Sequence, residues 1–227
     1  MSACPNEYGE VFAHWRAAAQ EWDAYTRHAF VVRLGDGTLP RAAFLHYLKQ
    51  DYVFLIHFSR AWALGVVKAA SLDEMKTCAG TVDALVNHEM QLHVTTCAEA
   101  GISSEALEAT VEAAANLAYT RYVLEAGFSG DFLDLLAALA PCVMGYGEIG
   151  ARLADEAISD TYHPWIDTYA GTEYQGVCKT VGAMIDRAVT DRLGSDWRQS
   201  PRMDALAARF ATATRLEVGF WDMGLAP

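Results

Sequence analysis

The chain has 227 residues, of which 52% are hydrophobic and 20% are charged, and its net charge is −12. This length and composition exclude a disordered chain and suffice for one hydrophobic core, so we expect a single domain over 1–227. An acidic surface repels phosphate groups, so neither nucleic acid nor an acidic membrane is an expected partner. The longest uncharged apolar run, between Asp134 and Glu148, is too short to span a bilayer, and no signal peptide precedes it. A cytoplasmic protein is therefore expected.

Helix-forming residues dominate the chain, and no run of alternating apolar and polar residues predicts a strand. A first helical region is expected over about 7–30, in one or two pieces. Gly35-Asp36-Gly37 predicts a turn. Thr38 offers an N-cap for a second helix over about 40–70, because it stands two residues before Pro40.

The remaining helices complete an all-α bundle. Ser71 precedes two acidic residues, which is typical of a helix start. His163-Pro164 is expected in a loop. The architecture is therefore a bundle of seven or eight helices with short loops. These further helices are expected over about 71–101, 103–127, 172–193 and 200–223, with one more that opens at Ser129 and carries Pro141.

Five cysteines are present, an odd number, and no Cys-x-x-Cys pair occurs. Neither a disulfide framework nor a zinc ribbon is expected from this pattern. Each cysteine taken alone is most simply a small buried hydrophobic residue. They are Cys4, Cys78, Cys97, Cys142 and Cys178.

Three expected helices each carry one reactive group on an apolar stripe. Asp51, Cys142 and Glu217 each occupy a position where helical spacing predicts a buried side chain. A buried carboxylate is costly unless it is paired, and burial raises the pKa of a carboxyl toward the range of a general acid or base. One such group has a structural explanation, a hydrogen bond to a neighbouring helix. Three together predict a central pocket. The stripes are Phe44, Leu48, Asp51, Leu55, Phe58 and Trp62; Leu135, Leu139, Cys142, Tyr146 and Ile149; and Leu206, Phe210, Ala213, Glu217 and Phe220.

One possible metal motif needs weighing. His88-Glu89 with His93 forms Glu-x-x-x-His on a single expected helix. The di-iron bundle motif is Glu-x-x-His and occurs on two helices, so a metal-dependent oxygenase is a poor match. A structural hydrogen bond or a pair on the helix surface is the favoured interpretation, and no metal or other cofactor is expected.

An ordered set of short motifs resembles the TenA family, also called thiaminase II. The set covers the chain from about residue 10 to its end, and although each piece is weak alone, the order and intervals make it specific. The resemblance implies a haem-oxygenase-like bundle without haem, a homotetramer, and hydrolysis of aminopyrimidines or thiamine to hydroxymethylpyrimidine for thiamine salvage. The motifs are Gly35-Asp36-Gly37-Thr38-Leu39-Pro40, Gln50-Asp51-Tyr52, Pro141-Cys142 with Tyr146, Trp165-Ile166-Asp167-Thr168-Tyr169, and Glu217 with Phe220-Trp221.

The resemblance also implies roles for individual residues. Cys142 would be the nucleophile that attacks the pyrimidine ring, Asp51 would hydrogen-bond the ring nitrogen and amino group, and Glu217 would shuttle protons. Phe54 replaces a tyrosine found in many members, which removes a hydroxyl and leaves the preferred substrate open. The resemblance implies thiamine, aminomethylpyrimidine or its formyl derivative as the expected substrate. Further pocket residues are Tyr119, with Tyr122 as the alternative, Tyr146, Tyr169 and Phe220.

A second function remains open at this point, a helical bundle that binds a pyrimidine or thiamine, or acts as a regulator, without catalysis. Members of the family have been described as transcriptional activators. The acidic charge and the lack of a basic recognition helix argue against direct binding to DNA. Tight binding without product would distinguish this function from the hydrolase.

Overall fold

A computed structural model describes residues 5–226, and every regular element among them is a helix. The expected all-α fold is confirmed. Five long helices form the bundle: α4 (Arg41–Lys68), α8 (Ala114–Ser129), α9 (Phe132–Glu156), α11 (Thr172–Leu193) and α12 (Pro201–Leu225). The shorter elements are the 3-10 turn η1 (Pro5–Tyr8), α1 (Glu10–Ala18), α2 (Trp22–Thr26), α3 (Ala29–Asp36), α5 (Leu72–Ala84), the π-helical turn η2 (Leu85–Glu89), α6 (Met90–Glu99), α7 (Ser104–Glu108), α10 (His163–Ala170) and the 3-10 turn η3 (Trp197–Gln199).

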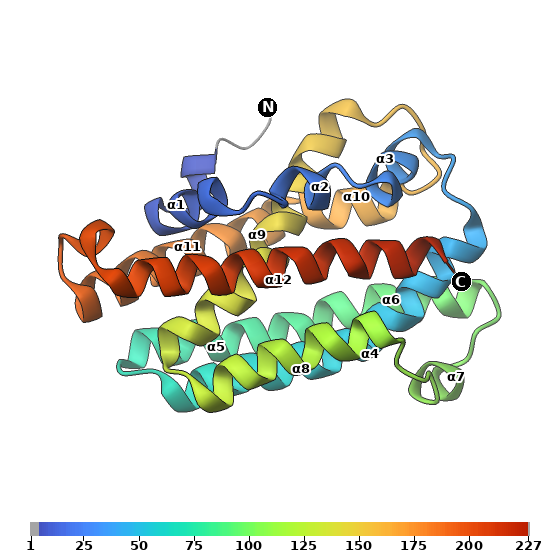
Figure 1. The fold of residues 1–227 in the computed structure, drawn as a ribbon. Coiled ribbons are helices and arrows are strands. Elements are labelled where there is room, and N and C mark those ends of the chain that lie inside the picture. Colours follow the sequence, from blue (N-terminus) through green and yellow to red (C-terminus); the bar gives the residue numbers. More distant parts are fainter. Residues whose placement is uncertain (1–4, 227) are drawn as a thin grey trace.

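Helix α12 organises the bundle, because it packs against α9, α8, α4 and α1. In Figure 1, α12 runs through the middle of the molecule, with α4, α5, α6 and α8 along one side and α1 and α2 along the other. Helices α10 and α11 pack against α9. The elements that carry Asp51, Cys142 and Glu217 are therefore mutual neighbours.

The buried stripes are confirmed. Asp51 on α4 is 3% exposed, Cys142 on α9 is 8% exposed and Glu217 on α12 is 1% exposed, and their apolar stripe partners are all buried. Helix α9 is long and apolar enough to cross a membrane, but 94% of its most apolar window is buried inside the bundle, which makes it the central core helix. Cys78, Cys97, Cys142 and Cys178 are buried free thiols, and Cys4 lies outside the described residues.

Several expected helix bounds agree with the structure. The helices expected over 40–70, 172–193 and 200–223 are α4, α11 and α12. Ser71 starts α5 through a capping box with Glu74, in which the Ser71 hydroxyl accepts from the Glu74 amide and the Glu74 carboxylate accepts from the Ser71 amide.

The N-terminal part is divided more finely than expected, since 7–30 contains α1, α2 and the start of α3. The turn begins only at Gly37, whose φ of 77° ends α3 in the left-handed conformation. Thr38 is not the N-cap of α4. Its amide and hydroxyl both donate to the Asp36 carboxylate, and Pro40 occupies the N-cap instead.

The single helix expected over 103–127 is wrong, because the chain breaks between α7 and α8. Gln50 of α4 explains the break. Its side-chain amide donates to the Val111 carbonyl at 2.9 Å, and its side-chain carbonyl accepts from the Ala113 amide at 3.0 Å. The tertiary contact thus satisfies the backbone groups that a continuous helix would have paired internally.

The start predicted at Ser129 and the loop predicted at His163-Pro164 are also wrong. Ser129 ends α8, and Asp131 caps α9 through a reciprocal pair with Asp134. His163-Pro164 forms the first turn of α10, where proline is tolerated because its missing N–H would have no partner there. These divisions give twelve α-helices within 5–226 rather than seven or eight.

Candidate active site

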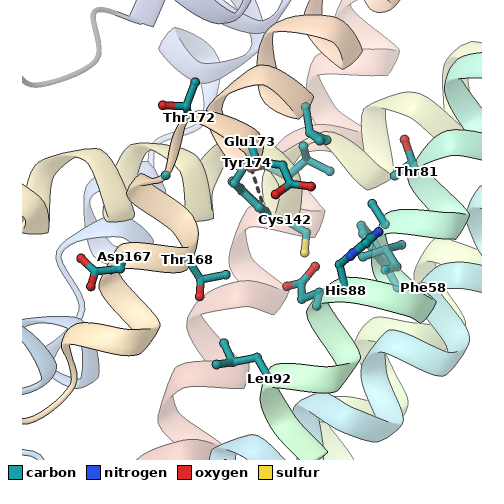
Figure 2. A pocket seen from close by; sticks show the side chains of 16 residues that line it. Phe58, Thr81, His88, Leu92, Cys142, Asp167, Thr168, Thr172, Glu173 and Tyr174 are labelled. Carbon is teal, nitrogen blue, oxygen red and sulfur yellow. Dashed lines mark hydrogen bonds between the residues drawn. The ribbon is translucent and has the colours of Figure 1, made fainter. Parts of the chain in front are cut away.

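A cavity of about 470 Å³ opens beside Cys142. Figure 2 shows the Cys142 side chain extending into this cavity from α9, with Tyr174 of α11 and His88 of η2 among the side chains around it. Glu89 and Leu92 line the same cavity. A volume of this size accommodates a small organic molecule, so Cys142 is a thiol that a ligand can reach.

Asp51 is held by two donors from different helices. The Tyr47 hydroxyl donates to Asp51 Oδ2 at 3.0 Å, and His93 Nε2 lies 2.6 Å from the same oxygen. The Trp165 indole N–H in turn donates to the Tyr47 hydroxyl at 3.2 Å. This network joins α4, α6 and α10 around one buried carboxylate.

His93 is fully buried, and acceptors face both of its ring nitrogens. Nδ1 lies 3.0 Å from the Glu89 backbone carbonyl, which can only accept, and Nε2 faces the Asp51 carboxylate. Burial alone would lower the pKa of His93, but the Asp51 hydrogen bond and charge outweigh it and the pKa is raised. The pair is therefore an imidazolium bonded to a carboxylate.

Glu217 lies in the core of α12 and accepts a hydrogen bond of 2.8 Å from the Tyr119 hydroxyl. Burial raises the pKa of Glu217 to about 8, with a smaller contribution from the Asp51 charge. Glu217 is consequently protonated at neutral pH and able to donate a proton. Tyr122, the alternative to Tyr119, is half-buried and donates to the Arg209 carbonyl instead.

The predicted aromatic residues are buried and form two groups. Phe54 has its ring centroid 5.0 Å from that of Tyr119 and 5.3 Å from that of Phe220. Tyr146 lies 4.9 Å from Tyr169. Neither group lines the 470 Å³ cavity. Of the predicted site residues, Cys142 alone lines it.

The Cys142 thiol is not pre-ionised. Burial raises its pKa well above the ordinary value, and the charges of Glu217, Glu89 and Asp51 raise it further. These three carboxyl groups thus lie near enough to the sulfur to act on it. A base must take the thiol proton as the sulfur reacts, because the resting thiolate is strongly disfavoured.

Two contributors to this site were not predicted in these roles. His93 is the partner of Asp51, whereas the sequence placed it in a possible pair with Glu89. The Glu89 side chain turns away to Tyr169, whose hydroxyl donates to Oε1 at 2.7 Å. The favoured structural hydrogen bond of His93 is confirmed, and no cluster of three or more potential metal ligands occurs within the described part of the chain.

Comparison with known proteins gives several relatives that match over most of their length. A protein of Haemophilus influenzae named only as uncharacterised is 41% identical over 90% of this chain and 93% of its own. An aminopyrimidine aminohydrolase of Halalkalibacterium halodurans is 38% identical over 89% of both chains. The crystal structure of a TenA family transcription regulator from a Silicibacter species superposes with a TM-score of 0.97, at 63% identity, over 99% of this chain and 100% of that one.

The fold is also found beyond close relatives. A domain of unknown function with a haem-oxygenase-like fold, from Shewanella denitrificans, superposes with a TM-score of 0.61 at 15% identity over 94% of this chain and 90% of that one. The haem-oxygenase-like bundle implied by the motifs is thereby confirmed. The model of the TENA/THI-4/PQQC family matches residues 15–226. The chain belongs to the TENA/THI-4/PQQC family.

Proposed function

We propose that the protein is an aminopyrimidine aminohydrolase. It converts 4-amino-5-aminomethyl-2-methylpyrimidine and water into hydroxymethylpyrimidine and ammonia, as a step of thiamine salvage. The observation that carries the proposal is the Cys142 thiol, which faces a 470 Å³ cavity while the Asp51 and Glu217 carboxyls act on it from the core. The activity named for the Halalkalibacterium relative supports the same reaction.

Asp51 and the aromatic side chains bind the ring in this proposal. The imidazolium of His93 and the Tyr47 hydroxyl fix the Asp51 carboxylate, which accepts from the amino group of the pyrimidine. The ring would extend inward from the cavity to Phe54 and Phe220, whose ring faces lie next to Tyr119, and Tyr146 and Tyr169 form a second pair of packed rings. No bound metal or organic cofactor takes part in these steps.

The chemistry proceeds through addition of Cys142 to the ring. As the sulfur bonds to the ring carbon beside the one that carries the aminomethyl group, Glu217 protonates the ring nitrogen and then receives the thiol proton. Electrons from the ring form an exocyclic double bond, and the amine takes up one proton as it leaves as ammonia. Water adds to the exocyclic carbon and gives up one proton. The sulfur is then expelled and recovers its proton from Glu217, which takes back the proton of the ring nitrogen. Each positioned proton transfer of this kind contributes about 10²- to 10⁴-fold in rate.

The test is ammonia release from purified protein supplied with aminomethylpyrimidine, its formyl derivative and thiamine in parallel. Cys142→Ser should abolish turnover and keep the wild-type circular dichroism. Cys178→Ser is the matched control, because Cys178 is also buried but its thiol donates a hydrogen bond to the Val143 carbonyl and does not line the cavity. Wild-type turnover by Cys142→Ser would refute the nucleophile, and tight binding without product in the wild type would favour a non-catalytic pyrimidine-binding protein.

We also propose that the enzyme is a cytoplasmic homotetramer. The free thiols of its described cysteines suit a reducing compartment. Val67 and Phe128, which are 80% and 72% exposed, line an apolar groove between α4 and α8 that another subunit would cover. Light scattering after gel filtration tests the assembly, and a monomer would refute it.

A further inference from the structure

Glu89 is a carboxyl group at the cavity that the mechanism above does not use. It is the last residue of η2, a π-helical turn between α5 and α6, and such turns are frequent at functional sites because they re-aim one side chain. Glu89 lines the cavity together with Cys142, whereas Glu217 lies in the core and does not. The two glutamates therefore approach the sulfur from different surroundings.

Both ends of Glu89 are held in place. The Tyr169 hydroxyl of α10 donates to its Oε1 at 2.7 Å, and its backbone carbonyl accepts from His93, the residue that binds Asp51. The position of Glu89 is thus tied to the group expected to hold the pyrimidine. Cys142 attacks the ring carbon next to the one that bears the exocyclic carbon, and Cys142 and Glu89 line the same cavity, so the exocyclic carbon would lie beside that cavity.

The proton affinity of Glu89 suits acid–base work. Burial and the charge of Asp51 raise the pKa of Glu89 to about 7, while the Tyr169 hydrogen bond and His93 lower it. At neutral pH the group is therefore divided between its acid and carboxylate forms, and each form is accessible in every turnover.

We propose that Glu89 is the catalytic acid–base residue for the exocyclic carbon, donating a proton to the departing amine and then taking one from the attacking water. The assignment rests on the proposed hydrolase function and divides the proton transfers between two residues. Glu217 serves the thiol and the ring nitrogen in the core. Glu89 serves the leaving group and the water on the cavity side.

The steps balance. The carbon–nitrogen bond breaks with its electron pair on nitrogen, and the Glu89 proton converts that nitrogen into neutral ammonia. The Glu89 carboxylate then takes a proton from water as the oxygen bonds to the exocyclic carbon, and the electrons return through the ring as Cys142 leaves. Glu89 ends the cycle protonated, as it began.

A pair of substrates isolates the proton donated to the leaving group. Ammonia must leave aminomethylpyrimidine with an added proton, whereas the thiazole of thiamine leaves as a neutral molecule and needs none. Single-turnover release of each leaving group is measured for Glu89→Gln, which preserves the acceptor for Tyr169. Where the wild type does not cleave thiamine, a pyrimidine that carries a pyridinium at the same carbon replaces it, because pyridine also leaves as a neutral molecule without an added proton.

Glu89→Gln should slow ammonia release by 100-fold or more and release of the thiazole or pyridine by less than 10-fold. Glu217→Gln should slow both releases to a similar extent. Glu99→Gln, an exposed carboxyl on α6, is the control and should match the wild type with both substrates.

Two results would overturn the role of Glu89 and leave the hydrolase proposal standing. One is an equal loss with both leaving groups. The other is ammonia release at the wild-type rate by a Glu89→Gln protein that melts like the wild type. A wild-type protein that releases no leaving group from any of these substrates would overturn the hydrolase proposal, and the assignment with it.

Discussion

Replacing His93 by leucine should be among the most destabilising single changes in the site. The substitution leaves the Asp51 carboxylate, which is 3% exposed, with the neutral Tyr47 hydroxyl as its remaining hydrogen-bond donor among those described above. Removing one partner of a buried ion pair costs about 3–5 kcal/mol, because the other charge stays buried and uncompensated. We therefore expect His93→Leu to lower the free energy of unfolding by about that amount.

Urea denaturation followed by circular dichroism measures this loss. With a denaturant slope of about 3 kcal/mol/M, the midpoint should fall by about 1–1.7 M. His46→Leu on α4 is the control, since it removes a half-buried imidazole and should change stability by less than about 1 kcal/mol.

The double variant His93→Leu with Asp51→Leu provides the sharper test. Replacing both members of a buried pair by apolar residues is often neutral or stabilising relative to the intact pair, so the double variant should recover the loss and be about 3–5 kcal/mol more stable than His93→Leu alone. Both variants should be inactive, because Asp51 binds the substrate in the proposed mechanism. A double variant no more stable than the single one would refute the view that an uncompensated Asp51 charge causes the loss.

Two further predictions concern α9 and α12. Glu217→Gln should reduce turnover at least 100-fold. Because the pKa of Glu217 is raised, the stability that its neutral form contributes is fully present below pH 4.5 and is lost as pH rises through about 8. The variant should therefore be roughly 2–5 kcal/mol more stable than the wild type at pH 9 and equally stable at pH 4.5. Stability curves that run parallel over this pH range would contradict the argument. Gly150→Ala should lower the free energy of unfolding by about 1–3 kcal/mol and lower kcat/KM, because the added Cβ would lie 2.5 Å from the Tyr169 backbone and displace the residue that binds Glu89. The control Gly219→Ala, whose Cβ would have no atom within 4 Å, should be neutral or stabilising in the same urea titrations. Equal effects of the two substitutions would contradict the packing argument.

The long helices could be predicted from the sequence because their signals are local. The apolar stripe around Asp51 has helical spacing, and the capping box at Ser71 lies within four residues. The errors arose where a distant residue decides the backbone. Gln50 holds the break between α7 and α8 from another helix, and no pattern within residues 103–127 reveals that contact.

The site divides in the same way. Asp51, Cys142 and Glu217 could be singled out because each interrupts or occupies an apolar stripe, and spacing alone shows that they are buried. Their hydrogen-bond partners, His93 for Asp51 and Tyr119 for Glu217, lie 42 and 98 residues away along the chain. Such pairings depend on how the helices cross, which periodicity does not contain.

The electrostatics of the site favour a resting state in which the reactive groups carry little charge. Burial raises the pKa values of both Cys142 and Glu217, so thiol and carboxyl are neutral at pH 7, and the paired charges of Asp51 and His93 compensate each other. A free thiolate in this core would have to persist beside carboxyl groups that repel it. Ring addition avoids that cost if Glu217 protonates the ring nitrogen as the sulfur attacks. The electron pair of the sulfur then forms a bond to the ring and does not remain as a free negative charge. The Glu217 carboxylate forms only at the moment when the thiol proton becomes available to it. In the proposed mechanism the substrate ring itself is thus the group that makes Cys142 reactive, and the buried thiol stays inert until a pyrimidine is bound.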